Sequence, residues 1–259
     1  MQLLEFPRFV WPIFLISFVM ISVRLVGLYA RAGKEEGFMI TSWYILGACF
    51  WFPWIFFTTN LLLHCFGSSL NGAFAAGIDA WYVSTLILLF FAPVGLGACY
   101  YFIPKITGQP IYSSQLASIA FWGLAALGGW TGMQKYNGGP ISAWMPAVGG
   151  AAMILLLVPA GIVAWNFHLS AKGQHGKIQT SPTLRFVFVG SFSFFVMSGV
   201  GALIGTFWTG SMMQFTHAEY GYQILAVYGF FSMTMFGAIY YIVPRLSGCE
   251  WLSARLIRN

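Results

Sequence analysis

Residues 98–108 read ACYYFIPKITG, and residues 238–248 read AIYYIVPRLSG. Each stretch closes a long apolar segment with one formula: a tyrosine pair, two apolar residues, a proline, a cation and, three residues later, a glycine. A proline cannot donate the hydrogen bond that continues a helix and disfavours helix at the preceding residue, so we expect each helix to end there. Tyrosines suit a membrane interface, and a cation suits the negative end of a helix. The formula therefore predicts two membrane-exit caps and an internal pseudo-symmetry.

The composition is that of an integral membrane protein. Of the 259 residues, 59% are hydrophobic and only 7% are charged, whereas a soluble domain carries about 25% charged residues. So few charges cannot cover a water-facing surface, and we expect the lipid bilayer to be the surroundings of this chain. The formal net charge of +6 is explained by cations in short loops, so it predicts no nucleic-acid partner.

Seven apolar stretches are long enough to cross the hydrocarbon core, which takes about 20 helical residues. They cover residues 9–30, 40–65, 80–103, 114–133, 144–168, 184–208 and 220–243. We therefore predict an all-α fold, a polytopic membrane helix bundle, with residues 1–259 as one transmembrane domain. Small residues let helices approach closely in lipid, and we expect such contacts at four glycines: Gly95, Gly97, Gly199 and Gly201.

The loop cations alternate between the two sides of the predicted bundle. The loops after the first, third, fifth and seventh spans carry Arg31, Lys34, Lys105, Lys172, Lys177, Arg185, Arg245, Arg255 and Arg258, and the other side carries only Arg8 and Lys135. Cytoplasmic loops are enriched in Lys and Arg, so we expect Met1 outside and Asn259 in the cytoplasm. Since an outside N-terminus without a leader is unusual, we also expect this chain to be the middle of a larger unit.

Three stretches resemble subunit I of the heme-copper oxidases, with the cbb3-type cytochrome c oxidases nearest and the nitric oxide reductases as relatives. They read DAWYVSTLILLFFAPVGLGACYYFIPKITGQPIYS, TSPTLRFVFVGSFSFFVMSG and FGAIYYIVPRLSG. The resemblance implies that the seven spans correspond to the fourth to tenth of a twelve-helix core with three pseudo-symmetric helix groups. It further implies a bacterial inner membrane, other membrane subunits and c-type cytochromes as partners.

The same resemblance implies five histidine ligands, and this sequence has another residue at every one of those positions. The copper-ligand histidine after a Trp-Tyr falls at Ser84, and an adjacent histidine pair falls at Gln134 and Lys135. A His-x-His that serves the two hemes falls at Tyr222 and Ile224. Because copper and heme iron take imidazole ligands in this family, we expect no heme or copper in this chain and hemes in partner subunits.

Only four histidines are present in the whole chain. His64 and His217 lie near the outer ends of spans two and seven, away from the positions that the resemblance implies, so a heme or metal role for either is a minor alternative to a solvated side chain. Where the hemes would sit, we expect a polar cavity lined by Ser84, Thr85, Tyr222 and Gln223. Hydrogen bonds between packed helices are the alternative role of these four side chains.

Three functions remain open at this stage. The first is a non-catalytic structural or assembly subunit of a membrane electron-transfer (respiratory) complex, which keeps the fold of subunit I and has lost its ligands. The second is a working oxidoreductase, a cytochrome c oxidase or nitric oxide reductase, with displaced ligands. The third is a proton or small-solute transport module, although Asp79, Lys135 and Glu219 fall at span ends and give little support to a chain of buried carboxylates.

Overall fold

The computed structural model describes residues 9–36, 40–65 and 72–249, and within them the chain is helical, with no β-strand. Seven of the described segments are long and apolar enough to cross a membrane, which confirms the predicted all-α polytopic bundle. The first two spans are α1 (Trp11–Glu36) and α2 (Ile40–Cys65), and the third joins α3 (Gly72–Leu86), η1 (Ile87–Phe91) and α4 (Ala92–Thr107). It begins eight residues before the predicted start, because the helix continues through the less apolar segment from Gly72.

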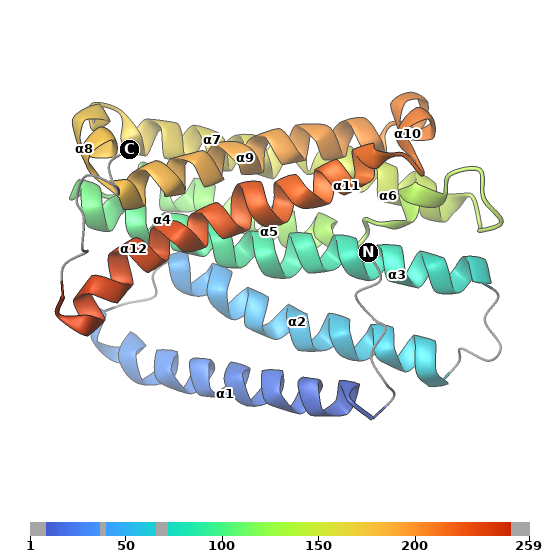
Figure 1. The fold of residues 1–259 in the computed structure, drawn as a ribbon, viewed down its shortest axis with the longest axis horizontal. Helices are drawn as coiled ribbons and strands as arrows, with labels where there is room; N and C mark the ends of the chain where they lie inside the picture. Colours follow the sequence, from blue (N-terminus) through green and yellow to red (C-terminus); the bar gives the residue numbers. More distant parts are fainter. Residues whose placement is uncertain (1–8, 37–39, 66–71, 250–259) are drawn as a thin grey trace.

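The remaining four spans complete the bundle. They consist of α5 (Ser114–Gly128) followed by η2 (Met133–Tyr136); α6 (Trp144–Leu155) with α7 (Leu157–Ala171); α9 (Pro182–Gly205); and α11 (His217–Ile224), η3 (Leu225–Ser232) and α12 (Met233–Ser247). Two short helices, α8 (His175–Thr180) and α10 (Phe207–Met213), connect spans at opposite ends of the bundle (Figure 1).

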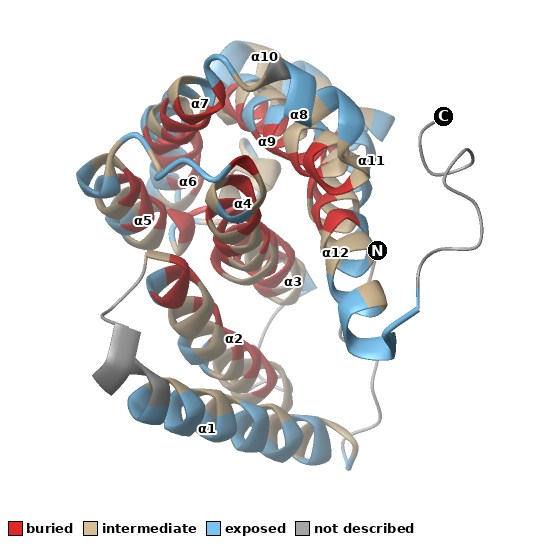
Figure 2. Ribbon diagram, turned by 90° about the vertical axis from the view of Figure 1, so that its left-hand side faces the viewer, coloured by how far each residue is buried: buried red, intermediate tan, exposed pale blue. Residues whose placement is uncertain are grey.

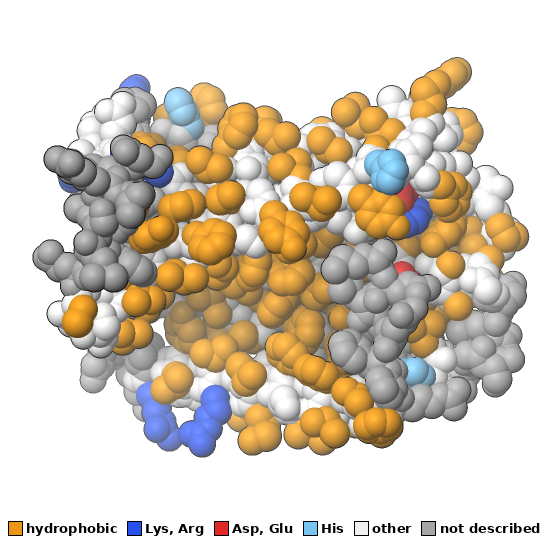
Figure 3. Space-filling view, in the orientation of Figure 1, with side chains coloured by type: hydrophobic (Ala, Val, Ile, Leu, Met, Phe, Trp, Pro, Cys, Tyr) orange, Lys and Arg blue, Asp and Glu red, His pale blue; other side chains and the backbone are white. Residues whose placement is uncertain are grey.

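The third span is the centre of the bundle. Its most apolar window is 72% buried, whereas the corresponding window of α1 is entirely unburied. Seen along the helices, α3 and α4 lie between α2 on one side and α9 on the other, and α1 lies at the edge against α2 (Figure 2). Hydrophobic side chains also cover much of the outer face (Figure 3), as expected where lipid replaces water.

The two predicted caps are real, but the proline does not end either helix. Pro104 and Pro244 lie inside α4 and α12, which continue for three more residues. Each helix ends where Gly108 and Gly248 adopt left-handed conformations, with φ of 71° and 67°. The N–H of Gly108 donates to the Pro104 carbonyl at 2.9 Å, so glycine supplies the stop that the sequence assigned to proline.

Tyrosines and glycines of these segments show how the helices pack. Tyr100 is 1% exposed and packs against the rings of Tyr44 and Phe167, so the prediction that it contacts lipid and water at the membrane interface was wrong. A side chain at Gly95 would collide with the Phe230 ring, and Gly97 and Gly201 also face close neighbours, as predicted. Gly199 has no atom near the position of a Cβ, so the prediction of a close contact there was wrong.

Two π-helices occupy matching places in the two pseudo-symmetric spans. η1 and η3 each precede a Tyr-Tyr cap, and they meet through Phe91 and Phe231, whose ring centroids are 4.7 Å apart. A π-helical turn contains an additional residue, so it rotates the preceding helix relative to the following one. These two segments therefore set which side chains of α3 and α11 point into the bundle.

Candidate functional site

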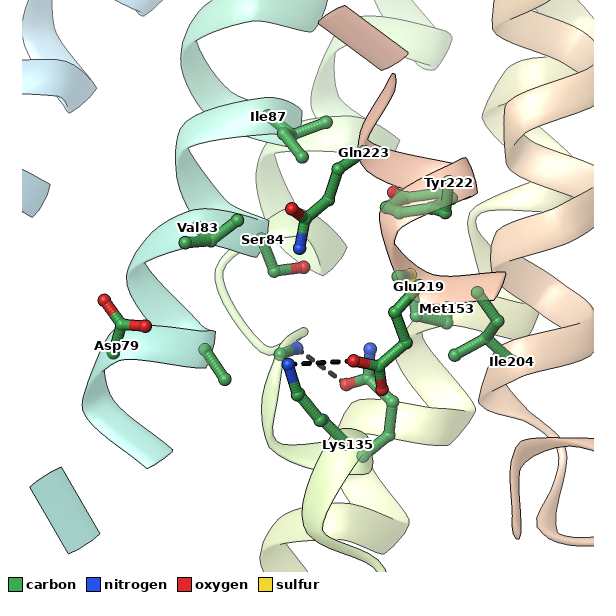
Figure 4. Close-up of a pocket in the computed structure, with 13 residues that line it drawn as sticks. Asp79, Val83, Ser84, Ile87, Lys135, Met153, Ile204, Glu219, Tyr222 and Gln223 are labelled. Atoms are coloured by element: carbon green, nitrogen blue, oxygen red, sulfur yellow. Dashed lines mark hydrogen bonds and ion pairs between the residues drawn. The ribbon is translucent and has the colours of Figure 1, made fainter. Parts of the chain in front are cut away.

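Four of the five positions at which the resemblance implies a ligand line a single cavity near the end of the bundle that is opposite the two caps. The cavity measures about 70 Å³, and its walls come from α3, η1, the α5–α6 connection, α6, α9 and α11 (Figure 4). The lining residues are Asp79, Ala80, Val83, Ser84, Ile87, Gly132, Gln134, Lys135, Met153, Ile204, Glu219, Tyr222 and Gln223.

An ion pair crosses the cavity. The Lys135 Nζ lies 2.8 Å from the Glu219 carboxylate, so the pair joins the α5–α6 connection to the first turn of α11. The glutamate side chain is 11% exposed and the lysine side chain 33% exposed. Glu219 sits where the positive end of the α11 dipole favours a carboxylate, and the lysine neutralises it in a site that is mostly shielded from solvent.

Hydrogen bonds beside the ion pair join α3 to the residues that follow α5. The Ser84 and Thr131 hydroxyls are 2.8 Å apart, and the Trp81 indole N–H donates to the Gly129 carbonyl at 2.8 Å. Gly132 has a φ of 112°, and a Cβ there would lie 2.6 Å from Trp81 Cα, so only glycine allows this turn to approach α3 so closely. The fourth span is thus linked to the third by these hydrogen bonds and to the seventh by the ion pair.

Two polar side chains face the cavity without a partner among the described residues. Figure 4 shows Tyr222 and Gln223 of α11 directed toward the same space as Ser84. Tyr222 is 7% exposed as a whole, so most of its ring is buried beside the cavity. Because buried polar groups are normally hydrogen-bonded, to protein or to ordered water, the cavity has both the polarity and the room to hold a few water molecules.

Two of the residues singled out in the sequence point elsewhere. The Thr85 hydroxyl donates back to the Trp81 carbonyl at 2.7 Å, and Thr85 does not line the cavity. Ile224 is 58% exposed and lies on the outer surface of α11. Residues two apart on a helix point in nearly opposite directions, so Tyr222 and Ile224 cannot both face this cavity.

His64 and His217 also lie outside the cavity. The His64 ring stacks on Trp11 with centroids 6.3 Å apart, and the His217 ring lies 6.3 Å from that of Tyr220. Among the residues that the structure describes, no three His, Cys, Asp or Glu side chains are close enough together to hold a metal ion.

The residues present do not fit a heme or a copper ion. Ser84, Gln134 and Lys135 offer a hydroxyl, an amide and an ammonium in place of three imidazoles, and an ammonium repels a cation. Tyr222 and Met153 carry groups that bind heme iron in other proteins, but pockets for a drug-sized ligand measure about 300–1,000 Å³, and a heme is at least of that size. The 70 Å³ cavity is far too small.

Sequence reasoning did not assign Glu219, Thr131 and Met153 to this site. Their distance along the chain from Ser84 hides the contacts, since neither composition nor periodicity specifies which span ends meet. One signal was available for Glu219: it is one of six acidic residues in the chain and falls at a span end, as does Lys135. Opposite charges at span ends on the same side of a membrane are natural partners.

Comparison with known proteins identifies the fold that carries this cavity. Residues 2–259 match the family described as Cytochrome C and Quinol oxidase polypeptide I. The chain belongs to this family. The cbb3-type cytochrome c oxidase subunit CcoN1 of Stutzerimonas stutzeri is 26% identical over 254 residues, which are 95% of this chain and 53% of that protein. Cytochrome c oxidase subunit 1 of Rhodobacter capsulatus is 27% identical over 246 residues, 92% of this chain and 44% of that protein.

A third relative covers a shorter region. The cytochrome c oxidase subunit 1 homolog of Agrobacterium tumefaciens (strain T37) is 28% identical over 192 residues, 74% of this chain and 36% of the homolog. The chain therefore spans about half the length, or less, of the curated relatives that it matches. Membership in the polypeptide I family and seven apolar helices make it an integral membrane protein, and the family implies other membrane subunits as neighbours.

Proposed function

We propose that this chain is a cofactor-free, non-catalytic structural or assembly subunit of a membrane electron-transfer complex. The observation that carries the proposal is the cavity itself: four implied ligand positions meet there, and they carry Ser84, Gln134, Lys135 and Tyr222. Their donors do not suit copper or heme iron, and the cavity has about 70 Å³ of space. In this proposal the hemes belong to partner subunits, c-type cytochromes among them.

In this proposal, contacts around the cavity hold the helices together in place of a metal. A metal with ligands on several helices holds those helices together, and its loss removes that link. Here the Ser84–Thr131 hydrogen bond joins the third and fourth spans, and the Lys135–Glu219 ion pair joins the fourth and seventh. Direct side-chain contacts take the place of coordination in the same part of the bundle, which is the arrangement expected of a structural subunit.

The transport alternative receives less support from the middle of the bundle. The apolar side chains of Leu88, Leu96 and Leu156 line a cavity of only about 10 Å³, which is at the lower limit for a single water molecule. Buried hydroxyls nearby donate to carbonyls of their own helices: Ser198 to Phe194 and Thr234 to Phe230, each at 2.9 Å. A continuous water chain from the polar cavity to the capped end would have to cross this apolar layer.

The orientation is also a proposal. The ends of α1, α4, α7 and α12 lie at one end of the bundle (Figure 1), and the loop cations of the sequence follow those helices. We infer from the positive-inside bias that this capped end faces the cytoplasm of a bacterial inner membrane. The polar cavity then opens toward the outer side, on which we expect a c-type cytochrome.

A visible spectrum of the purified chain tests the proposal. The protein is produced in a host that makes hemes, purified in mild detergent and measured as a reduced-minus-oxidised difference spectrum together with its copper content. We expect no heme band and less than a tenth of a copper ion per chain. A heme or copper present at close to one equivalent would overturn the proposal and favour the oxidoreductase with displaced ligands.

A gain-of-ligand variant provides the positive control. Replacing Ser84, Gln134 and Lys135 together with histidine places three neutral imidazoles around the cavity and removes the repelling ammonium. We expect this triple variant to bind Zn²⁺ or Cu²⁺ with a dissociation constant of roughly micromolar, about 8 kcal/mol, measured by titration calorimetry. The matched double variant that keeps Lys135 should bind neither ion. Equal binding by the two variants would show that these positions do not share a site.

A further inference from the structure

A second feature of the bundle lies at the opposite end from the polar cavity. α7 and α9 diverge to leave an apolar groove of about 480 Å³ on the outer surface. Its walls are Ala164, Phe167, His168, Ala171, Ile178, Phe188, Ser191, Phe192 and Phe195. Phe167 is buried and forms part of the floor, whereas Phe192 is 67% exposed and forms an outer edge. The groove falls within the size range of about 300–1,000 Å³ that is typical of ligand pockets.

Basic residues extend both walls at the same end. Arg185 lies three and seven residues before Phe188 and Phe192, so it belongs to the same stripe of α9. Lys172 is the first residue after α7, whose last turn carries His168 of the groove wall, and both Lys172 and His168 are exposed. Arg185 is held at this end by a hydrogen bond from its Nε to the Gln179 carbonyl at 2.9 Å.

The short helix α8 closes this end of the groove. It connects α7 to α9 at this end of the bundle (Figure 1). Ile178 of α8 contributes to the apolar wall, and Lys177 beside it adds another cation, although its ammonium donates to the Thr107 carbonyl at 2.5 Å. No Asp or Glu occurs between residues 164 and 195, so no carboxylate of this segment offsets the charge of Lys172 and Arg185.

We propose that this groove binds an anionic phospholipid. One acyl chain lies between α7 and α9 against Phe188, Phe192 and Phe195, and the phosphate meets the cations of Lys172 and Arg185. The combination of an apolar slot and a basic mouth at its end matches the two parts of a phospholipid, and basic pockets between membrane helices recognise anionic headgroups. Lipid binding at this groove does not depend on whether the chain holds a cofactor. Its test is therefore independent of the test of the function proposed above.

Native mass spectrometry of the delipidated protein in detergent tests this assignment. It is titrated with phosphatidylglycerol and with phosphatidylcholine of the same acyl chains, so that only the headgroup charge differs. We expect phosphatidylglycerol to bind more tightly. A cation near an anionic lipid contributes about 1 kcal/mol, or about fivefold in affinity. The double variant Lys172→Gln/Arg185→Gln should therefore lose roughly twentyfold of the affinity for phosphatidylglycerol and little for phosphatidylcholine.

Three further variants distinguish the contribution of the charges from that of the apolar groove. Arg245→Gln removes a cation at the same end of the bundle, at the end of α12, and should leave both affinities unchanged. Phe192→Ala removes an exposed wall and should weaken both lipids equally, as should Ala164→Phe, which fills the slot. Thermal melting of each variant, followed by circular dichroism, identifies any that fails to fold.

Three results would overturn the assignment. The first is equal affinity of the native chain for the two lipids, and the second is an equal loss of phosphatidylglycerol binding in Arg245→Gln. The third is a change of oligomeric state in Phe192→Ala, measured by light scattering, with unchanged lipid affinity. That result would mean that a second copy of the chain occupies the groove instead of a lipid.

Discussion

The Lys135–Glu219 ion pair allows an asymmetric prediction. The two partners differ in their access to solvent: the glutamate side chain is 11% exposed and the lysine side chain 33% exposed. Lys135→Met leaves a nearly buried carboxylate without its partner, whereas Glu219→Gln leaves an ammonium that can reach water. The first variant should therefore be destabilised more than the second, although each breaks the same interaction.

The expected losses in the free energy of unfolding lie between two limits. Losing one partner of a fully buried pair costs about 3–5 kcal/mol, and an exposed pair contributes about 0–1 kcal/mol. We therefore expect Lys135→Met to lower the free energy of unfolding by about 2–3 kcal/mol and Glu219→Gln to lower it by about 1 kcal/mol. In the double variant no buried charge is left unpaired. Its loss of stability should therefore be smaller, by about 1–2 kcal/mol, than the sum of the losses in the two single variants.

Thermal unfolding in a single detergent, at one scan rate, provides the measurement. A change of 1 kcal/mol shifts the Tm of a chain of this size by roughly 2–4 °C, so the loss of about 2–3 kcal/mol in Lys135→Met should lower its Tm by roughly 4–12 °C. Lys105→Met removes a cation from an exposed position of α4 and is the matched control, with no expected shift. The reasoning would be refuted if the two single variants lost equal stability and the loss in the double variant equalled their sum.

Three other changes have defined outcomes in the same melting assay. Gly95→Ala should cost about 1–3 kcal/mol, because its Cβ would lie 2.5 Å from the Phe230 ring, and Phe230→Leu in the same chain should restore part of the loss. Tyr44→Phe should cost about 1 kcal/mol, because it removes a buried hydrogen bond of 3.0 Å to the Ala117 carbonyl; no loss would mean that the bond contributes nothing. Gly108→Ala should cost about 1–2 kcal/mol at its φ of 71° and Gly108→Asn less, and a reversed order would contradict the cap.

The number and approximate positions of the spans were predictable from the sequence because bilayer thickness imposes a minimum length on every apolar segment. The side chains that face inward were not readable in the same way. A span that is apolar on all sides carries no periodic signal that separates lipid from protein, so the burial of Tyr100 and the open surface beside Gly199 could not be predicted. The proline stop also failed, because a membrane helix can tolerate a missing hydrogen bond when neighbouring groups compensate.

The candidate site, too, was predictable only in part. The family register brought Ser84, Gln134, Lys135 and Tyr222 to the correct end of the bundle, since homologous helices keep their relative positions even at low identity. Thr85 was expected to line the cavity with Ser84, Tyr222 and Gln223, yet its hydroxyl donates to a carbonyl of its own helix. Adjacent residues on a helix point about 100° apart, and the π-helix η1 that follows changes the phase of the span.

The residues that line the cavity depend on one another. Five independent replacements of histidine would not produce this arrangement. Removing imidazoles alone would leave a large void lined by unpartnered polar groups, which is costly in both packing and hydrogen bonding. Instead the space is reduced to about 70 Å³, Gly132 brings the α5–α6 connection against α3, and Lys135 meets a carboxylate from the seventh span. Because the lysine is stabilised by Glu219 and would repel a metal, restoring any single histidine would not recreate a metal site. In the cofactor-free subunit that we propose, these residues act together to stabilise the bundle.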